Sequence, residues 1–160
     1  MGATLPEAIA ACAESQVGVH ETTINGGPQI AAYQRATWLP VGPWPWCAAF
    51  VCWVIQRATV GRKVTFPRPM TAGAWDFEHW CRSVDNSARL RKPASGDIRR
   101  GDLVIYRFSH IGIATGPPDA DGNFDAVEGN TDGAGSREGD GCWKKTRNIS
   151  AVRSRIRFTV

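Results

Sequence analysis

The segment PWCAAFVCWVIQR, residues 45–57, decides the fold of this chain. From residue 47 onward it is apolar on nearly every side of a helix, and a helix without a polar face is buried in a domain core. Three prolines between residues 40 and 45 precede the helix. They fix the backbone and remove hydrogen-bond donors, which predicts a stiff loop. Cys47 therefore stands at the start of a buried helix, directly after rigid chain.

Around this helix the chain separates into a helical first part and a β-rich second part. Thr4 can cap a helix that runs to about Gly18, and the sequence patterns predict further helices over residues 29–38 and 71–82. Short β-rich runs between turn residues predict five strands, at 102–107, 110–115, 123–128, 142–147 and 153–160. We therefore expect one α+β domain over residues 1–160, with N-terminal helices packed on a C-terminal antiparallel sheet.

The bulk composition limits the class of protein. A formal net charge of +4 favours polyanionic partners, but the basic residues form no dense block of the kind that marks a nucleic-acid tail. The five cysteines are scattered, which argues against a disulfide framework. Met1–His20 lacks the basic start of a secretory signal, and no stretch is apolar enough to span a bilayer. We expect a monomer that is made in the cytoplasm and does not insert into a membrane.

Cys47 and His110 are the first candidate site residues. Free amides and the partial positive charge at a helix start favour a thiolate at Cys47, although burial as a small apolar residue is the commoner fate of a cysteine. His110 opens a predicted strand in which Gly112 and Ala114 share its face. We expect these small residues to let the helix approach until the thiol reaches the imidazole.

The next strand offers partners for the histidine. Glu128 and Asn130 are two residues apart and point to the same face if the strand continues, where either side chain could orient the imidazole. The alternative for this segment is a strand end followed by a turn. Trp44 and Trp46, beside Cys47, are candidates for a substrate groove, and burial beneath the loop is the alternative for both.

Four segments, in this order and spacing, resemble the cysteine, histidine-dependent amidohydrolase/peptidase (CHAP) domains. They are PWCAAFVCW at 45–53, RGDLVIY at 100–106, SHIGI at 109–113 and VEGNT at 127–131. The upstream segment SQVGVHE, residues 15–21, resembles the opening helix of the same family, so the resemblance covers nearly the whole chain.

The resemblance implies a papain-like α+β fold and cleavage of amide bonds in bacterial peptidoglycan. It assigns the nucleophile to Cys47, the base to His110, the acidic residue that orients the histidine to Glu128 and a supporting asparagine to Asn130. Some phage members of the family bind calcium ahead of the cysteine, but residues 22–46 contain no Asp or Glu. We therefore expect neither a metal nor another cofactor.

The expected function is that of a phage endolysin that reaches the cell wall after release. The sequence leaves open whether it is an N-acetylmuramoyl-L-alanine amidase or a peptidoglycan endopeptidase, and an interbacterial toxin with the same chemistry is an alternative. Two alternatives come from other classes. A basic nucleic-acid-binding domain would use exposed Trp and Arg, and a zinc module would use the cysteines, although no pair has the Cys-x-x-Cys spacing.

Overall fold

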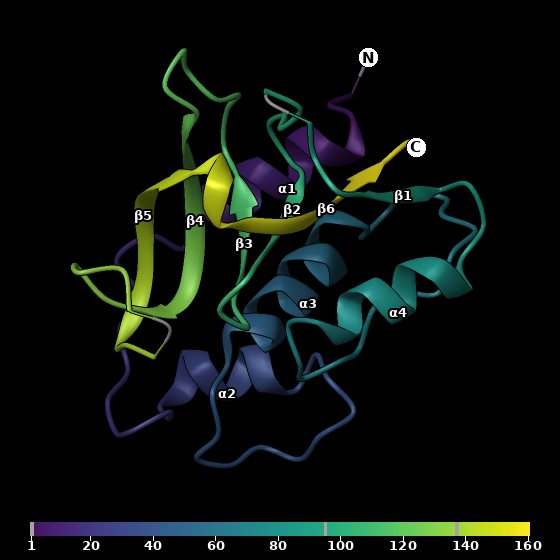
Figure 1. Cartoon of the computed structure of the whole chain (residues 1–160). Coiled ribbons are helices and arrows are strands. Elements are labelled where there is room, and N and C mark those ends of the chain that lie inside the picture. The colour runs from purple at the N-terminus through teal and green to yellow at the C-terminus, as the bar shows by residue number, and fades with distance from the viewer. Residues whose placement is uncertain (1, 95, 137) are drawn as a thin grey trace.

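The apolar segment after the proline-rich loop forms α3, Cys47–Ala58, which lies near the centre of the molecule (Figure 1). The computed structural model describes residues 2–94, 96–136 and 138–160. Within them α3 packs against α1 (Leu5–Glu14), α2 (Pro28–Gln34) and two strands of the sheet. Because α3 is covered on several sides, its apolar circumference is explained, and the prediction of a buried helix that starts at Cys47 is confirmed.

The remaining helices differ from their predicted bounds. The Thr4 hydroxyl accepts a hydrogen bond from the amide of Glu7, as expected of a cap, but α1 ends at Glu14 rather than near Gly18. The last helix, α4, spans Asp76–Ser83 and starts five residues later than the pattern predicted.

The second half of the chain forms a six-stranded antiparallel sheet with the order β1-β6-β2-β3-β4-β5, counted over the described residues. Its strands are β1 (Ala88–Arg91), β2 (Leu103–Tyr106), β3 (Ile111–Ala114), β4 (Asn123–Thr131), β5 (Gly141–Asn148) and β6 (Val152–Phe158). The α+β class is therefore confirmed, and five of these strands lie where they were predicted. The sequence analysis missed β1, which pairs with β6 at the edge of the sheet.

The two faces of the sheet bury different apolar clusters. The larger cluster joins α1, α2 and α3 to the inward side chains of the strands, including Ile111, Ile113 and Val127. A smaller cluster on the opposite face includes Tyr106 and Ala114. Neighbouring residues of one strand thus belong to different clusters, as the alternation of side chains along a strand requires.

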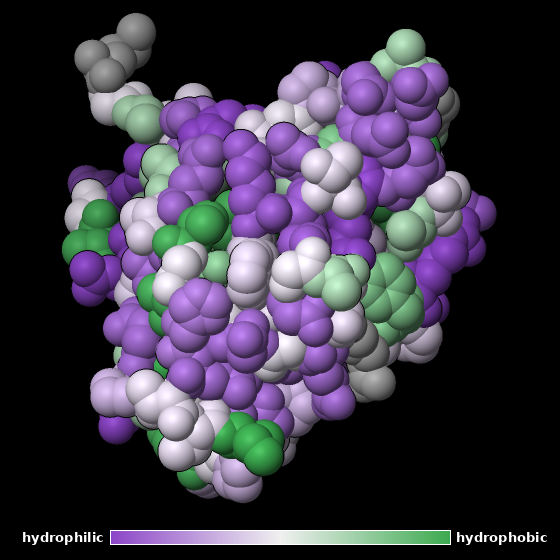
Figure 2. Space-filling model, turned by 90° about the vertical axis from the view of Figure 1, so that its left-hand side faces the viewer, coloured by the Kyte–Doolittle hydropathy of each residue, from purple (hydrophilic) through white to green (hydrophobic). Residues whose placement is uncertain are grey.

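The surface seen from the β5 side of the molecule is mostly hydrophilic, with apolar residues scattered rather than joined in one patch (Figure 2). Among the described residues, no helix has the length and apolar character needed to cross a membrane.

Candidate active site

His110 is held at the end of the tight connection between β2 and β3. The backbone amide of Tyr106 donates to the carbonyl of His110 at 2.9 Å. Ser109, just before the histidine, has a φ of +56°, in the left-handed region that costs a residue with a Cβ roughly 1 kcal/mol or more. The His110 side chain is fully buried as a result of this turn.

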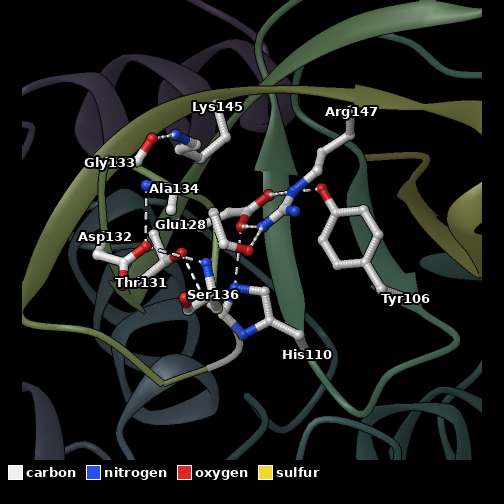
Figure 3. Close-up of polar contacts among 11 residues, drawn as sticks. Tyr106, His110, Glu128, Thr131, Asp132, Gly133, Ala134, Ser136, Lys145 and Arg147 are labelled. Atoms are coloured by element: carbon white, nitrogen blue, oxygen red, sulfur yellow. Dashed lines mark hydrogen bonds and ion pairs between the residues drawn. The ribbon is translucent and has the colours of Figure 1, made fainter.

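Glu128 in β4 is the centre of a buried polar network (Figure 3). Its carboxylate accepts hydrogen bonds from His110 Nε2 at 2.9 Å, from the hydroxyl of Tyr106 at 2.8 Å and from Nε and Nη2 of Arg147 in β5. Both the imidazole and the carboxylate are 0% exposed. Since a buried charge is tolerated only when it is paired, Arg147 is what allows an ionised Glu128 beside the histidine.

The network sets the protonation states of its members. Burial raises the pKa of Glu128, but the hydrogen bonds and charges of Arg147 and His110 outweigh it and lower that pKa to about 2. Burial lowers the pKa of His110, but Cys47 and Glu128 outweigh it and raise that pKa to about 9. Burial and the charge of Glu128 hold the pKa of Tyr106 well above its usual value. At neutral pH the site therefore contains a carboxylate, a protonated imidazole and a phenol that donates.

Cys47 meets this network from the helix side. It lines a cleft of about 240 Å³ whose described lining also includes Trp44, Ser109 and Glu138. Because Nε2 of His110 is engaged by Glu128, Nδ1 is the nitrogen left for the thiol, and no group in the described chain bonds to it. The thiol is near enough to contribute to the raised pKa of His110, although the two side chains do not complete a hydrogen bond.

The missing side chain of Gly129 lets α3 approach β4 closely. A Cβ on this residue would lie 2.8 Å from the Phe50 Cβ and 2.8 Å from Trp46 Cζ3, which real contacts do not allow. The prediction that Gly112 and Ala114 give α3 its space was wrong. Gly112 lies on the other face of the sheet, where a Cβ would come within 2.7 Å of Glu128 Cγ, so its small size makes room for the carboxylate.

Asn130 lies two residues beyond Glu128, as predicted, and is 0% exposed. Its φ is +56°, and the pairing of β4 with β5 shifts register between Glu128 and Thr131. Neither side-chain atom of Asn130 has a hydrogen-bond partner among the described residues. Asn130 is therefore buried two residues from Glu128 but is not bonded to His110.

The two tryptophans have different surroundings. Trp44 lines the cleft, and its indole N–H donates to the carbonyl of Pro40 at 2.8 Å, which fixes the ring on the proline-rich loop. Trp46 is fully buried, stacks on Tyr33 and donates to Glu21. The prediction that Trp46 lines a substrate groove was wrong, because its ring packs into the core beneath the loop.

The loop after β4 is anchored beside the site. The Thr131 hydroxyl donates to the carbonyl of Ser136, and Lys145 and Arg147 in β5 donate to the carbonyls of Gly133 and Gly135 (Figure 3). Arg147 therefore ties the loop to Glu128.

Sequence reasoning missed Tyr106 and Arg147. A buried tyrosine needs a partner for its hydroxyl, and a buried carboxylate beside a histidine needs a counter-charge. Both requirements indicated that further residues should bond to Glu128. The alternation of β2 could have placed Tyr106 on the face opposite Ile105. For Arg147 no local pattern sufficed, because its register partner is Phe124 and it reaches Glu128 diagonally.

Within the described ranges, no group of three or more His, Cys, Asp and Glu side chains is arranged to hold a metal ion. A scan against protein-family models, a search of curated proteins and a search of solved structures each returned no match.

Proposed function

We propose that this protein is a cysteine hydrolase in which Cys47 is the nucleophile, His110 the base and Glu128 the residue that orients the histidine. One observation carries the proposal. Nε2 of His110 is hydrogen-bonded to Glu128 at 2.9 Å, and Nδ1 is unpaired and near the thiol of Cys47, the first residue of α3. This arrangement of nucleophile, base and orienting carboxylate is the geometry that recurs in nucleophilic acyl transfer.

The chemistry follows from these contacts. The protonated imidazole and the positive end of α3 stabilise the Cys47 thiolate, which attacks an amide carbonyl. Trp46, the residue before the helix, provides no side-chain cap, so amides of the first turn are available to the oxyanion. His110 then donates its Nδ1 proton to the leaving amine, and water hydrolyses the thioester with the histidine as base.

Peptidoglycan is the substrate we propose, cleaved at the N-acetylmuramoyl-L-alanine bond or within its peptides by an endolysin-like enzyme. The support is the resemblance of four sequence segments to CHAP domains, together with an open cleft at Cys47 that carries Trp44 and the carboxylate of Glu138. An aromatic wall suits the face of a sugar or peptide, and a carboxylate suits an amine of the stem peptide. A papain-like fold is part of the same proposal.

The test is the Cys47→Ser variant on purified peptidoglycan. We expect turnover to fall roughly 10⁴-fold or more, because members of a catalytic unit fail together, while circular dichroism shows the fold retained. Cys52→Ala, in the same helix but with its thiol donating to the carbonyl of Thr71, is the matched control and should keep most activity. Mass spectrometry of the released fragments identifies the bond that is cut. A folded Cys47→Ser protein that still clears the wall would refute the proposal.

A further inference from the structure

The β1–β6 edge of the sheet carries four arginines on one face. In the register of these strands Arg89 lies opposite Arg157, and Arg91 lies opposite Arg155. Cross-strand partners point to the same side, so the four guanidinium groups share the face away from Leu90 and the helices. Like charges placed directly opposite one another destabilise a sheet, which calls for a compensating group.

Two aspartates compensate only half of this charge. Arg157 donates to both oxygens of Asp102, at 2.9 and 2.7 Å, and Arg155 donates to Asp97 at 2.9 Å. Arg89 and Arg91 are exposed and form no ion pair within the described ranges. The face therefore carries two fixed, paired arginines and two free ones.

The four arginines line a surface hollow of about 290 Å³, together with Asp97 and Thr159. One of them, Arg155, has a side chain only 4% exposed, yet its Nε–H has no hydrogen-bond partner among the described residues and lies 4.0 Å from Asp102. Its other donors bond to Asp97 and to the carbonyl of Arg89, so Arg155 is a fixed positive charge beneath the hollow. The hollow thus combines four arginines, one carboxylate and one hydroxyl, with a surplus of positive charge.

We propose that this arginine face, made of Arg89, Arg91, Arg155 and Arg157, binds the phosphodiester groups of a polyol-phosphate polymer of the bacterial cell wall. Arginine is suited to this ligand because its planar fork matches the oxygens of a phosphate. The paired Asp97 and Asp102 fix two of the forks in place, and the exposed pair supplies the attraction. The choice of a wall polymer rests on the proposed function, since that polymer surrounds the proposed substrate.

The hollow favours such a polymer over single-stranded nucleic acid. Proteins that hold single strands combine a basic groove with aromatic side chains on which bases stack, and no aromatic residue is among the described residues that line this hollow. A polyol phosphate has no bases and needs only charge and hydrogen bonds. The face also lies apart from the candidate active site, because β6 and β2 separate β1 from β3.

The test measures binding of free poly(glycerol phosphate) by the Cys47→Ser protein, in which hydrolysis plays no part. The variant Arg89→Gln/Arg91→Gln removes two exposed charges without breaking an ion pair in the described chain. We expect it to bind about tenfold more weakly and to lose roughly 1.4 from the slope of log affinity against log salt, which corresponds to two phosphate contacts. The control Arg35→Gln/Arg57→Gln removes the same charge from the residue after α2 and from α3, and should bind like the parent.

Three results would overturn the proposal: no binding by the parent protein, equal weakening in the control variant, or tighter binding of an oligothymidylate of equal charge. Failure of the proposed function is a separate readout, because it appears as uncleaved peptidoglycan with the wild-type protein. In the wild-type background, Arg89→Gln/Arg91→Gln should keep its turnover on peptidoglycan stripped of the polymer and lose turnover on walls that carry it.

Discussion

Two buried carboxylates in the sheet, Glu128 in β4 and Asp102 just before β2, each accept a forked hydrogen bond from an arginine. At Asp102 the remaining contacts are the backbone amide of Arg99, at 2.8 Å, and Nε of Arg155, at 4.0 Å. At Glu128 the further partners include His110, whose second ring nitrogen is unpaired and whose pKa the nearby Cys47 thiol helps to raise. The same kind of carboxylate–arginine pair therefore has different surroundings at the two places. Around Asp102 all partners are permanently charged or backbone groups, whereas around Glu128 one partner can exchange a proton.

The largest effects are expected when each carboxylate is neutralised in turn. Glu128→Gln should lower turnover about 10⁴-fold, because a neutral amide neither fixes the tautomer of His110 nor stabilises its protonated form. Asp102→Asn should leave turnover per folded molecule unchanged but lower the free energy of unfolding by roughly 3 kcal/mol, since Arg157 loses its buried counter-charge. Peptidoglycan turnover and urea unfolding of both variants provide the comparison.

A second measurement separates the roles within the Glu128 variant. The Cys47 thiol should still react with a small alkylating agent at neutral pH, because the helix terminus supports the thiolate independently of Glu128. Equal losses of turnover in Glu128→Gln and Asp102→Asn would mean that both carboxylates are structural.

The next test acts on the distance between helix and sheet. Gly129→Ala places a methyl group 2.8 Å from Phe50 Cβ, so α3 must move and carry Cys47 away from His110. We expect turnover to fall about 100-fold, the cost of a displacement near 1 Å in a catalytic geometry. Gly116→Ala is the control, since nothing lies within 4 Å of its added Cβ. If Gly129→Ala lowers stability but leaves turnover intact, the close approach of α3 has no part in the reaction.

The pH dependence sharpens the comparison further. The pKa of His110 is raised from 6.5 to about 9, so its contribution to stability is complete below pH 6.5 and is lost as pH rises through about 9. The alkaline limb of kcat/KM should fall tenfold per unit above pH 9 for the same reason. The pKa of Glu128 is lowered to about 2, so its contribution is present above pH 4.5 and is lost only as pH falls through about 2.

The Asp102 cluster holds no imidazole or thiol and should add nothing to this dependence between pH 6.5 and 9. The melting temperature of His110→Gln, measured across that range, is the check. It should vary less with pH than that of the wild-type protein, and an equal decline in both would assign the effect to another group.

The fold was predictable in segments whose local sequence pattern is compatible with only one kind of secondary structure. An apolar segment of helical length after three prolines predicts a buried helix, the short β-rich runs lie between turn residues, and the last of them alternates clearly. The strand β1 was missed because ARLR is short and half arginine, so only its pairing with β6 makes it a strand. Tertiary pairing, not propensity, decides such a segment.

The site was predictable in part for the same reason. The helix start at Cys47, the strand that His110 opens and the resemblance to CHAP domains together indicated that Cys47, His110 and Glu128 would converge. Alternation tells which residues share a face but not which face the helices cover, which is why Gly112 was assigned to the wrong neighbour. Whether Trp46 lies in a groove or in the core depends on how the loop folds back, and the contact of Arg147 with Glu128 crosses strands diagonally. None of these is encoded in local sequence.

The smallest effect in the series is expected at Asn130. Its backbone has a φ of +56°, which asparagine tolerates and glycine adopts freely, and its side-chain atoms have no partner in the described chain. Asn130→Gly should therefore preserve the melting temperature, because it relieves the backbone and removes a buried amide without a bonded neighbour. Turnover should fall no more than about tenfold, since an uncharged amide can position a catalytic group but stabilises a protonated imidazole weakly. Asn130→Ala separates the contribution of the amide from that of the backbone. It removes the same amide but keeps a Cβ at a positive φ, so a lower melting temperature than that of Asn130→Gly reports the backbone strain. Should Asn130→Gly lower turnover as far as Glu128→Gln does, then Asn130 rather than Glu128 orients His110, and the network around Glu128 is, like the one around Asp102, a structural ion pair.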